Sequence, residues 1–322
     1  MSKIFIYIPT YERQESLKNQ LLILKPQILK YKDSVRVLVR DNNSEGDYFL
    51  EISQEFQGLE NISFEKNFGN IDGNANIALG FSSAKEDEFI WLLSDNDIIN
   101  ENAIEYLLGQ INCKFDFILF NYTVTQPKEE VIELEDGFIK IMDGRMGLIS
   151  DALYNANSIR NSIRDAFYYH NSSFPHLAVA FSTIKKIGRA NFLILPRDCV
   201  HSKLIDCDFD DSKNFYPNYS LGQVGMPQLL PFFSKKSAKI FSLGWAREHS
   251  KWLYLHKEVY PGVFFGSKML LRKNGGFFIH FYLMLGKIYA ILNPVTIMLI
   301  NIAKKRLSKK LVSFLKKIRK VL

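Results

Sequence analysis

Two aspartates one residue apart, Asp95 and Asp97, follow the apolar run of residues 88–93. Burying an unpaired carboxylate is costly, so two of them at the end of a buried strand favour a nearby cation. In a turn, both can reach one hard divalent ion that also bridges diphosphate oxygens. The structural alternative is a solvated turn in which Asp97 or Asn100 caps the next helix. The pattern therefore predicts a metal held against a diphosphate, with Asp95 and Asn96 also contacting the bound nucleotide.

Polar residues also follow two earlier apolar runs. Residues 3–8 and 35–39 are nearly continuous apolar stretches, as expected of strands buried on both faces. Residues 10–13 follow the first stretch, and the turn-forming residues 41–44 follow the second. Further strands are expected at 61–65, 88–93 and 115–121, with helices at 17–28, 47–57, 75–85 and 103–111. Pro26 is expected to shorten or kink the first helix.

This alternation predicts an α/β fold, a mostly parallel sheet with helices on both faces. In such sheets, ligands bind beyond the carboxyl ends of the strands. The three polar clusters are therefore expected to form one site. Residues 150–190 are expected to be helical, whereas 201–258 are rich in aromatic residues and show no clean period.

The upstream polar residues each allow two interpretations. Asp41 could close an Asx-turn on its own backbone, or accept a hydrogen bond from a base N–H or a ribose hydroxyl. Arg13 could be a surface charge, or its guanidinium could contact a diphosphate. The Gly- and Asn-rich residues 67–76 lack the Lys-Ser/Thr of a Walker A motif and the close Gly triplet of a dinucleotide site. Asp72 and Asn74 in this stretch are candidate sugar or ribose contacts.

Taken in order, these motifs resemble the family 2 glycosyltransferases of the GT-A fold. The family's Pro-Thr-Tyr-x-Arg, Asp-Asp/Asn-Gly-Ser, Asn-x-Gly-x-x-Gly-x-x-Asn and Asp-x-Asp motifs have counterparts here between residues 3 and 120. The resemblance implies a GT-A catalytic domain and an inverting transferase that uses a nucleotide-sugar donor. It implies Mn²⁺ or Mg²⁺ on Asp97, and donor contacts from Pro9, Thr10, Tyr11, Arg13, Asp41, Asn42 and Asn67.

Inverting transfer needs a base for the acceptor hydroxyl. The family usually supplies it from an acidic pair at the start of a helix, and no such pair occurs between residues 150 and 200. His176 stands near that position, and neutral imidazole can accept a proton near pH 7. Asp165 and Asp151 are rival candidates, and a buried or capping role is the alternative for His176. His249 could be a third metal ligand or could simply pack beside Trp245 and Trp252.

The net charge of +7 is divided unevenly along the chain. No acidic residue follows Glu258, whereas thirteen basic residues do, which leaves 41 − 13 = 28 basic against 34 acidic residues before it. Residues 303–322 are expected to form a helix with a Leu/Ile stripe and a Lys/Arg face. Such a helix suits an anionic membrane interface; the alternative is a solvated helix packed on the body. The stripe and the lack of stacking aromatics argue against nucleic acid.

Residues 277–300 are apolar and long enough to span a bilayer, but Lys287 and Asn293-Pro294 favour a helix that lies on its surface. Three cysteines without metal-ligand spacing, and an N-terminus that starts in a strand, predict a cytosolic protein without a secretory leader.

The predicted domains are residues 1–200 for donor binding and catalysis, 201–258 for the acceptor side, and 259–322 for a membrane-associating tail. The predicted function is transfer of a sugar from a nucleotide sugar to a lipid-linked or surface oligosaccharide acceptor, at the inner face of the cell membrane. A metal-dependent nucleotidyltransferase and a non-catalytic membrane adaptor that has kept the fold are the alternatives.

Overall fold

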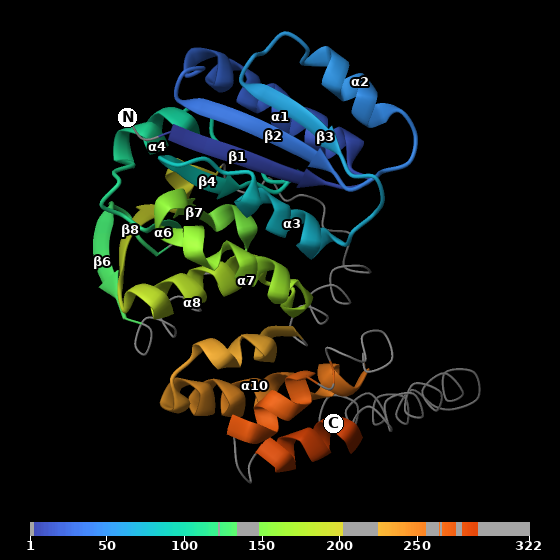
Figure 1. Ribbon diagram of the computed structural model, residues 1–322, viewed down its shortest axis with the longest axis vertical. Coiled ribbons are helices and arrows are strands. Elements are labelled where there is room, and N and C mark those ends of the chain that lie inside the picture. Colours follow the sequence, from blue (N-terminus) through green and yellow to red (C-terminus); the bar gives the residue numbers. More distant parts are fainter. Residues whose placement is uncertain are drawn as a thin grey trace, which may run out of the picture. The chain divides into compact units, whose positions relative to one another are not determined.

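The apolar runs of the N-terminal half form the centre of an eight-stranded sheet (Figure 1). Strand β1 (Lys3–Thr10) lies between β2 (Val35–Asp41) and β4 (Glu88–Leu92) and runs parallel to both. The carboxyl ends of these strands therefore meet at one edge of the sheet. The computed structural model describes residues 3–121, 123–133, 148–201, 225–255, 264, 266–274 and 279–288, and the side chains of most of them.

The remaining strands make the sheet mixed but mostly parallel. The strand order is β3-β2-β1-β4-β7-β5-β8-β6. Strand β3 (Ile62–Lys66) is parallel to β2, and β8 (Ala190–Pro196) is parallel to β5 (Phe117–Asn121). Strand β7 (Ala152–Asn155) runs antiparallel between β4 and β5, and β6 (Lys128–Ile132) runs antiparallel to β8. The predicted α/β class is confirmed.

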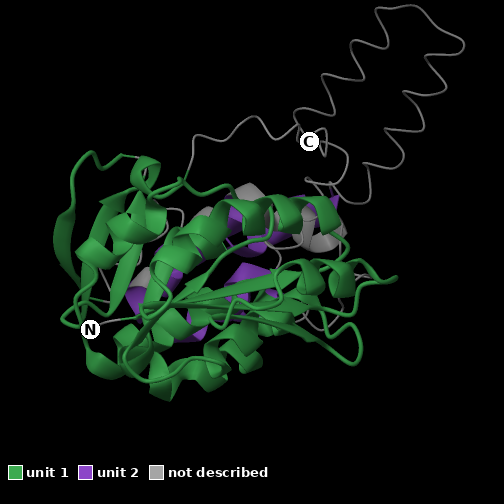
Figure 2. Ribbon diagram, turned by 90° about the horizontal axis from the view of Figure 1, so that it is seen from above, with its two compact units in different colours: residues 1–210 green, residues 211–322 purple. Residues whose placement is uncertain are grey.

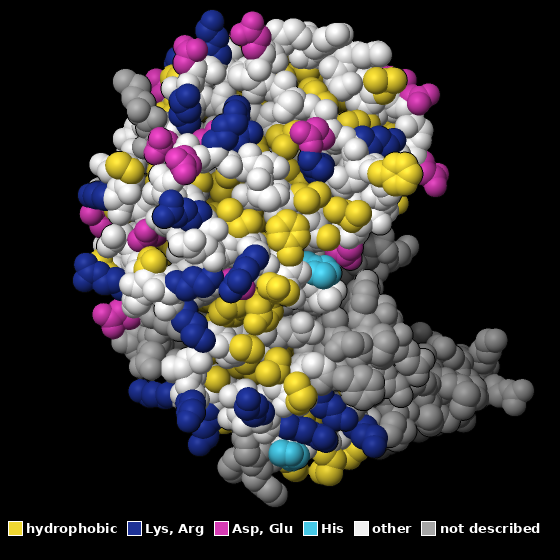
Figure 3. All heavy atoms as spheres, in the orientation of Figure 1, with side chains coloured by type: hydrophobic (Ala, Val, Ile, Leu, Met, Phe, Trp, Pro, Cys, Tyr) yellow, Lys and Arg dark blue, Asp and Glu magenta, His cyan; other side chains and the backbone are white. Residues whose placement is uncertain are grey.

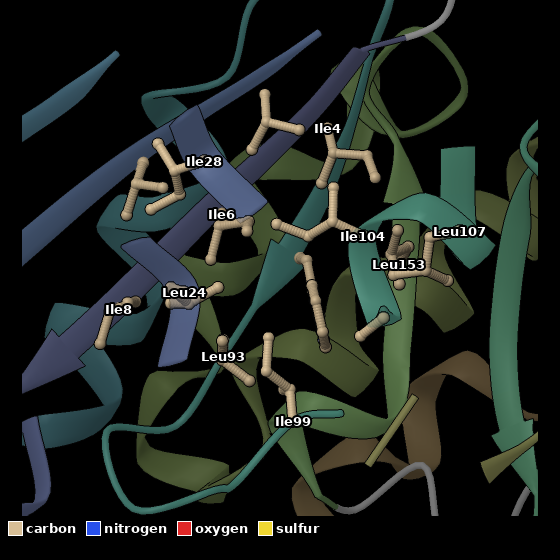
Figure 4. Packing of buried hydrophobic residues seen from close by; sticks show 14 of the residues in the cluster. Ile4, Ile6, Ile8, Leu24, Ile28, Leu93, Ile99, Ile104, Leu107 and Leu153 are labelled. Atoms are coloured by element: carbon tan, nitrogen blue, oxygen red, sulfur yellow. The ribbon is translucent and has the colours of Figure 1, made fainter. Parts of the chain in front are cut away.

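Helices cover both faces because β1 buries alternate residues on opposite sides. Ile4, Ile6 and Ile8 pack with α1 (Gln14–Lys30), α2 (Tyr48–Glu55) and α4 (Ala103–Gln110) in one large core (Figure 4). Tyr7 faces the other side and donates to the main-chain oxygen of Asn76 in α3 (Gly73–Ser82). Helix α3 in turn packs on α7 (Ile163–Tyr168) and α8 (Pro175–Ile187), and α6 (Ala156–Ile159) packs on α8.

Two local details differ from the predictions. Helix α1 continues through Pro26 to Lys30, so the proline does not shorten it, although a proline within a helix costs about 3 kcal/mol. The flanking Leu24 and Ile28 are fully buried, so packing outweighs that cost. Residues 152–155 form strand β7 rather than helix, since a four-residue Ala-Leu-Tyr-Asn segment buried on both faces has no periodicity of its own.

The chain divides into two units, residues 1–210 and 211–322 (Figure 2). In the second unit, a 3₁₀ segment (Met226–Phe232), helix α10 (Lys235–Leu255) and helical stretches at 266–274 and 279–288 surround a small core of their own. Among the helices that the structure describes, none has the length and apolar character needed to cross a bilayer. The predicted tail helix at 303–322 and residues 289–300 lie outside the described residues.

Candidate functional site

The acidic turn begins directly beyond β4, where Asp95 is almost fully buried. The Thr10 hydroxyl donates to one of its carboxylate oxygens at 2.8 Å, and the Arg13 guanidinium donates to the other at 2.8 Å. Burial raises the pKa of Asp95, while the charge of Arg13 and the two hydrogen bonds act in the opposite direction. The end of β1 therefore supplies both partners of the first aspartate of the motif.

Asp97 lies at the far side of the same turn and is partly buried. Burial raises the pKa of its carboxyl group, opposed by a hydrogen bond from the Ser150 side chain and by the charges of Arg197 and Arg13. The side-chain amide of Gln20 in α1 donates to the main-chain oxygens of Ser94, at 2.5 Å, and Asp97, at 2.9 Å. Helix α1 therefore fixes the backbone of the turn from one side.

Asp41, at the end of β2, is completely buried and closes an Asx-turn. Its two carboxylate oxygens accept from the main-chain N–H of Ser44 at 3.0 Å and from the Ser44 hydroxyl at 2.6 Å. The same hydroxyl oxygen accepts from the main-chain N–H of Glu12 at 2.8 Å, so this turn also holds the start of the β1–α1 connection. Asp41 therefore closes an Asx-turn on its own backbone, the first of its two interpretations. Its contact with a nucleotide stays a prediction.

A chain of asparagine side chains joins the end of β2 to the Gly- and Asn-rich loop. The Asn42 amide oxygen accepts from the Asn67 side chain at 3.1 Å and from the main-chain N–H of Ile71 at 3.0 Å. Asn67 also donates to the Asn76 side chain at 3.1 Å. Asp72 caps α3 by accepting from the main-chain N–H of Asn74 at 2.7 Å. These amides order a loop that has no regular structure of its own.

A pocket of about 280 Å³ opens where these elements meet. Its lining includes six predicted contacts: Pro9, Thr10, Tyr11, Arg13, Asn42 and Asp95. Ser94, Gly73, Asn76, Ile77 and Ile149 complete it. Asp41, Asn67, Asp72, Asn74, Asn96 and Asp97 lie in the same turns and loops without lining the pocket.

The predicted bases lie elsewhere in the first unit. Asp165 in α7 accepts from Ser182 and from Lys186, the latter at 3.1 Å, both in α8. His176, in the first turn of α8, is buried, and its ring lies 6.0 Å from the Phe174 ring. Neither lines the pocket. His249 belongs to α10 of the second unit, and its side chain lies outside what the structure describes.

The donor set of the acidic turn fits a metal shared with a phosphate ligand. In the described parts of the chain, no three His, Cys, Asp or Glu side chains are arranged to hold an ion by themselves. Carboxylate oxygens are the ligands that Mg²⁺ and Mn²⁺ prefer, and Mg²⁺ is usually bound through one or two carboxylates together with substrate phosphates. Asp95 and Asp97 match that pattern.

Three residues that hold the acidic turn or act on it through their charge were not predicted from the sequence: Gln20, Ser150 and Arg197. Gln20 falls on the apolar face of α1, where a polar residue among Leu17, Leu21 and Leu24 could have suggested a buried partner. Ser150 and Arg197 are brought near the turn by strands β7 and β8, and neither strand was predicted from the sequence.

The chain resembles two glycosyltransferase-type proteins of Staphylococcus aureus, although no protein-family model matches it. The poly(ribitol-phosphate) β-N-acetylglucosaminyltransferase TarP (strain N315) is 27% identical over 127 residues, which is 38% of this chain and 38% of that protein. The solved structure of TarS 1-349 in complex with UDP matches 89% of this chain and 90% of that one, with a TM-score of 0.50 and 14% identity. A likeness at that identity shows the fold alone. The chain is therefore a GT-A-fold protein that is related to TarP in sequence and to TarS in fold.

Proposed function

We propose that this chain is a metal-dependent glycosyltransferase that takes its sugar from a nucleoside diphosphate sugar. The observation that carries the proposal is the convergence of Thr10, Arg13 and Asp95 in one pocket at the carboxyl ends of β1 and β4. Nucleotides bind at this edge of an open α/β sheet. The volume of about 280 Å³ is close to the lower end of the range of about 300–1,000 Å³ for small-molecule sites.

The charge of the site suits a diphosphate. Helices α1 and α3 begin beside the pocket, and a helix N-terminus favours an anion. The Arg13 side chain is half exposed, so its guanidinium can turn from Asp95 to a phosphate group without unburying other groups. Asp41, Asn42 and Asn67 would hold the nucleoside, and Asp72, Asn74 and Asn96 are proposed to lie toward the sugar.

Asp97, together with Asp95, would hold Mn²⁺ or Mg²⁺. When bound, the ion neutralises the charge that develops on the departing nucleoside diphosphate. Ion pairing with Arg13 and hydrogen bonding to Thr10 oppose the rise that burial causes in the pKa of Asp95, and a metal requires the ionised carboxylate.

For the base that accepts the acceptor's proton, we propose His176 ahead of Asp165. The Asp165 carboxylate is already engaged by the Ser182 hydroxyl and the Lys186 ammonium group. His176 lies at the start of α8, near the position where the resembled family carries its acidic pair, and an imidazole can accept a proton near pH 7. A His176→Asn variant that retains donor binding but loses transfer would support this role, whereas full transfer by it would exclude His176.

The donor and acceptor to test first come from the relatives. TarP is named for N-acetylglucosamine transfer to poly(ribitol-phosphate), and TarS was solved with UDP. UDP-N-acetylglucosamine is therefore the first donor to test, and a phosphate-containing, lipid-linked or surface glycan is the acceptor class.

A peripheral position at the inner face of the cell membrane fits the composition of the second unit. Between residues 225 and 288 the sequence has two acidic residues, Glu248 and Glu258, against ten basic ones. Ile240, Met269, Phe281 and Met284 are exposed apolar side chains of this unit. Figure 3 shows Lys and Arg side chains beside apolar ones toward the bottom of its view. Burial and the charges of Arg272 and Lys287 lower the pKa of Lys268, so these three cations lie near one another. Together with the predicted tail helix, they would favour anionic lipid.

Two experiments test the proposal. Calorimetric titration with UDP and Mn²⁺, followed by a transfer assay with UDP-N-acetylglucosamine, separates the enzyme from its alternatives. An adaptor would bind neither ligand, and a nucleotidyltransferase would release pyrophosphate rather than UDP. Sedimentation with phosphatidylglycerol vesicles tests the membrane: deleting residues 303–322 should release the protein, and unchanged binding would exclude the tail as an anchor.

A further inference from the structure

Two segments far apart in the sequence meet beneath the acidic turn. They are the 3₁₀ turn Ile149–Asp151, just before β7, and residues 197–201, just after β8. Ser150, Asp151, Arg197 and His201 are all buried, and none of them belongs to the proposed donor contacts. Four buried polar side chains at one place need a reason, because each has to recover the hydrogen bonds it loses to water.

The Ser150 hydroxyl holds the start of the acidic turn. Its oxygen accepts from the main-chain N–H of Ser94 at 2.9 Å, and Ser94 is the residue directly before Asp95. This hydroxyl therefore sets the backbone from which the turn that carries Asp95 and Asp97 begins.

Ser150 is itself held in place by its neighbours. Its main-chain oxygen accepts from the Trp91 indole at 2.9 Å and lies 3.2 Å from Nε2 of His201. The next residue, Asp151, accepts from Nε of Arg197 at 2.8 Å in a pair that is almost completely buried. These contacts hold the backbone at Ser150 in place.

Residues 197–201 also bind the far end of the turn directly. Ile99 forms an isolated antiparallel bridge with His201. The main-chain N–H of Asn100 donates to Val200 at 2.8 Å, and its side chain donates to the main-chain oxygen of Asp198 at 2.7 Å. With Gln20 of α1 on the other side, the turn is fixed at Ser94, Asp97, Ile99 and Asn100.

We infer that Ser150 is a positioning residue for the acidic turn that carries Asp95 and Asp97, and that the buried Asp151–Arg197 pair next to it holds it in place. It fixes the backbone from which the two carboxylates reach the metal and does not itself touch donor or acceptor. This inference rests on the proposed function and names the residues that prepare its metal ligand. Groups that orient a metal ligand typically contribute about 10-fold to 100-fold to metal affinity or activity.

The test compares Ser150→Ala and Arg197→Lys with Ser158→Ala as the matched control. Ser158 also donates to a carboxylate, that of Asp116 at 2.6 Å, but lies in α6 and does not line the pocket. Calorimetry gives the affinity for UDP without metal and the affinity for Mn²⁺ in the presence of UDP. We expect Ser150→Ala to weaken Mn²⁺ binding about 10-fold and to leave metal-free UDP binding within twofold. Arg197→Lys should weaken Mn²⁺ binding less, and Ser158→Ala should change neither.

The outcomes separate this inference from the proposed function. Equal loss of Mn²⁺ and UDP binding in Ser150→Ala, or a lowered Tm with unchanged Mn²⁺ affinity, would mean a structural role and overturn the inference. Wild-type affinity for Mn²⁺ in Ser150→Ala would also overturn it while leaving the proposed function intact. If the wild-type protein binds neither UDP nor Mn²⁺, the proposed function fails and the inference fails with it.

Discussion

Arg13 and Asp95 form an ion pair of 2.8 Å in which the aspartate is almost completely buried and the arginine is half exposed. The buried Asp95 carboxylate is fixed in position, whereas the half-exposed Arg13 side chain can change its conformation. The pair therefore satisfies a carboxylate that would otherwise be costly to bury, and it keeps a guanidinium at the mouth of the pocket. When a diphosphate binds together with a divalent cation, the diphosphate can pair with Arg13 and the cation with Asp95, so each side chain keeps a partner of opposite charge.

Substitution of Arg13 should lower the affinity for nucleotide and change the free energy of unfolding only slightly. We expect Arg13→Gln to reduce the affinity for UDP by roughly 10-fold or more, because a charged hydrogen bond to phosphate is typically worth about 1.5–3 kcal/mol. Arg13→Lys should recover only part of the loss, since an ammonium group lacks the planar fork. Lys18→Gln is the control: Lys18 lies on the same helix in a surface pair with Glu55. Equal UDP affinity in the Arg13 and Lys18 variants would contradict the prediction.

Much of the donor side of the site could be predicted because its residues are adjacent to the strands that carry them. Thr10 and Asp41 each end a strand with a strong apolar pattern and Asp95 follows another, and parallel pairing of β1 with β2 and β4 brings them together. Periodicity and turn chemistry are local properties, so a single sequence is enough to read them.

The other half of the site could not be predicted for the opposite reason. Ser150 and Arg197 reach the acidic turn only because β7 pairs antiparallel with β4 and β8 lies beside β5. Those pairings join residues more than 50 positions apart, as in the contact of Ser150 with Trp91. Strand β7 has four residues and no alternation, so nothing local marks it as part of the sheet.

Removal of the metal, or of its proposed ligand, should abolish transfer and preserve the fold. Treatment with EDTA should stop turnover by the wild-type protein, and added Mn²⁺ should restore it. Asp97→Asn should lower kcat by roughly 100-fold or more, because the charge on the leaving diphosphate would lose its electrostatic stabilisation. Calorimetric titration of Mn²⁺ in the presence of UDP gives the binding defect independently of turnover. Full activity after EDTA would show that the reaction needs no metal.

Gly80 is expected to tolerate no side chain, although it lies within a helix. A Cβ atom there would lie 2.7 Å from the Tyr7 ring and 2.8 Å from Leu92, because α3 approaches the sheet closely at this point. Overpacking of a core typically costs about 1–3 kcal/mol, more than the gain of up to about 1 kcal/mol that alanine brings to a helix. Gly80→Ala should therefore lower the Tm.

Gly109→Ala is the matched control, since Gly109 lies in α4 and a Cβ atom there would meet nothing within 4 Å. That variant should keep or raise the Tm. A higher Tm for Gly80→Ala than for Gly109→Ala would contradict the close packing of α3 on β1.

Buried His201 should make the protein less stable as the pH falls below about 6.5. Burial and the nearby charge of Arg197 lower its pKa from 6.5 to about 3, so the folded protein keeps this ring neutral. Between pH 6.5 and 3, the unfolded chain binds a proton at this ring that the folded chain does not bind. The free energy of unfolding therefore decreases with falling pH, by about 2 kcal/mol at pH 5. A His201→Gln variant lacks this proton uptake, so its Tm should fall less than that of the wild type between pH 7.5 and 5. Parallel Tm curves for the two proteins over that range would mean that His201 titrates alike in both states.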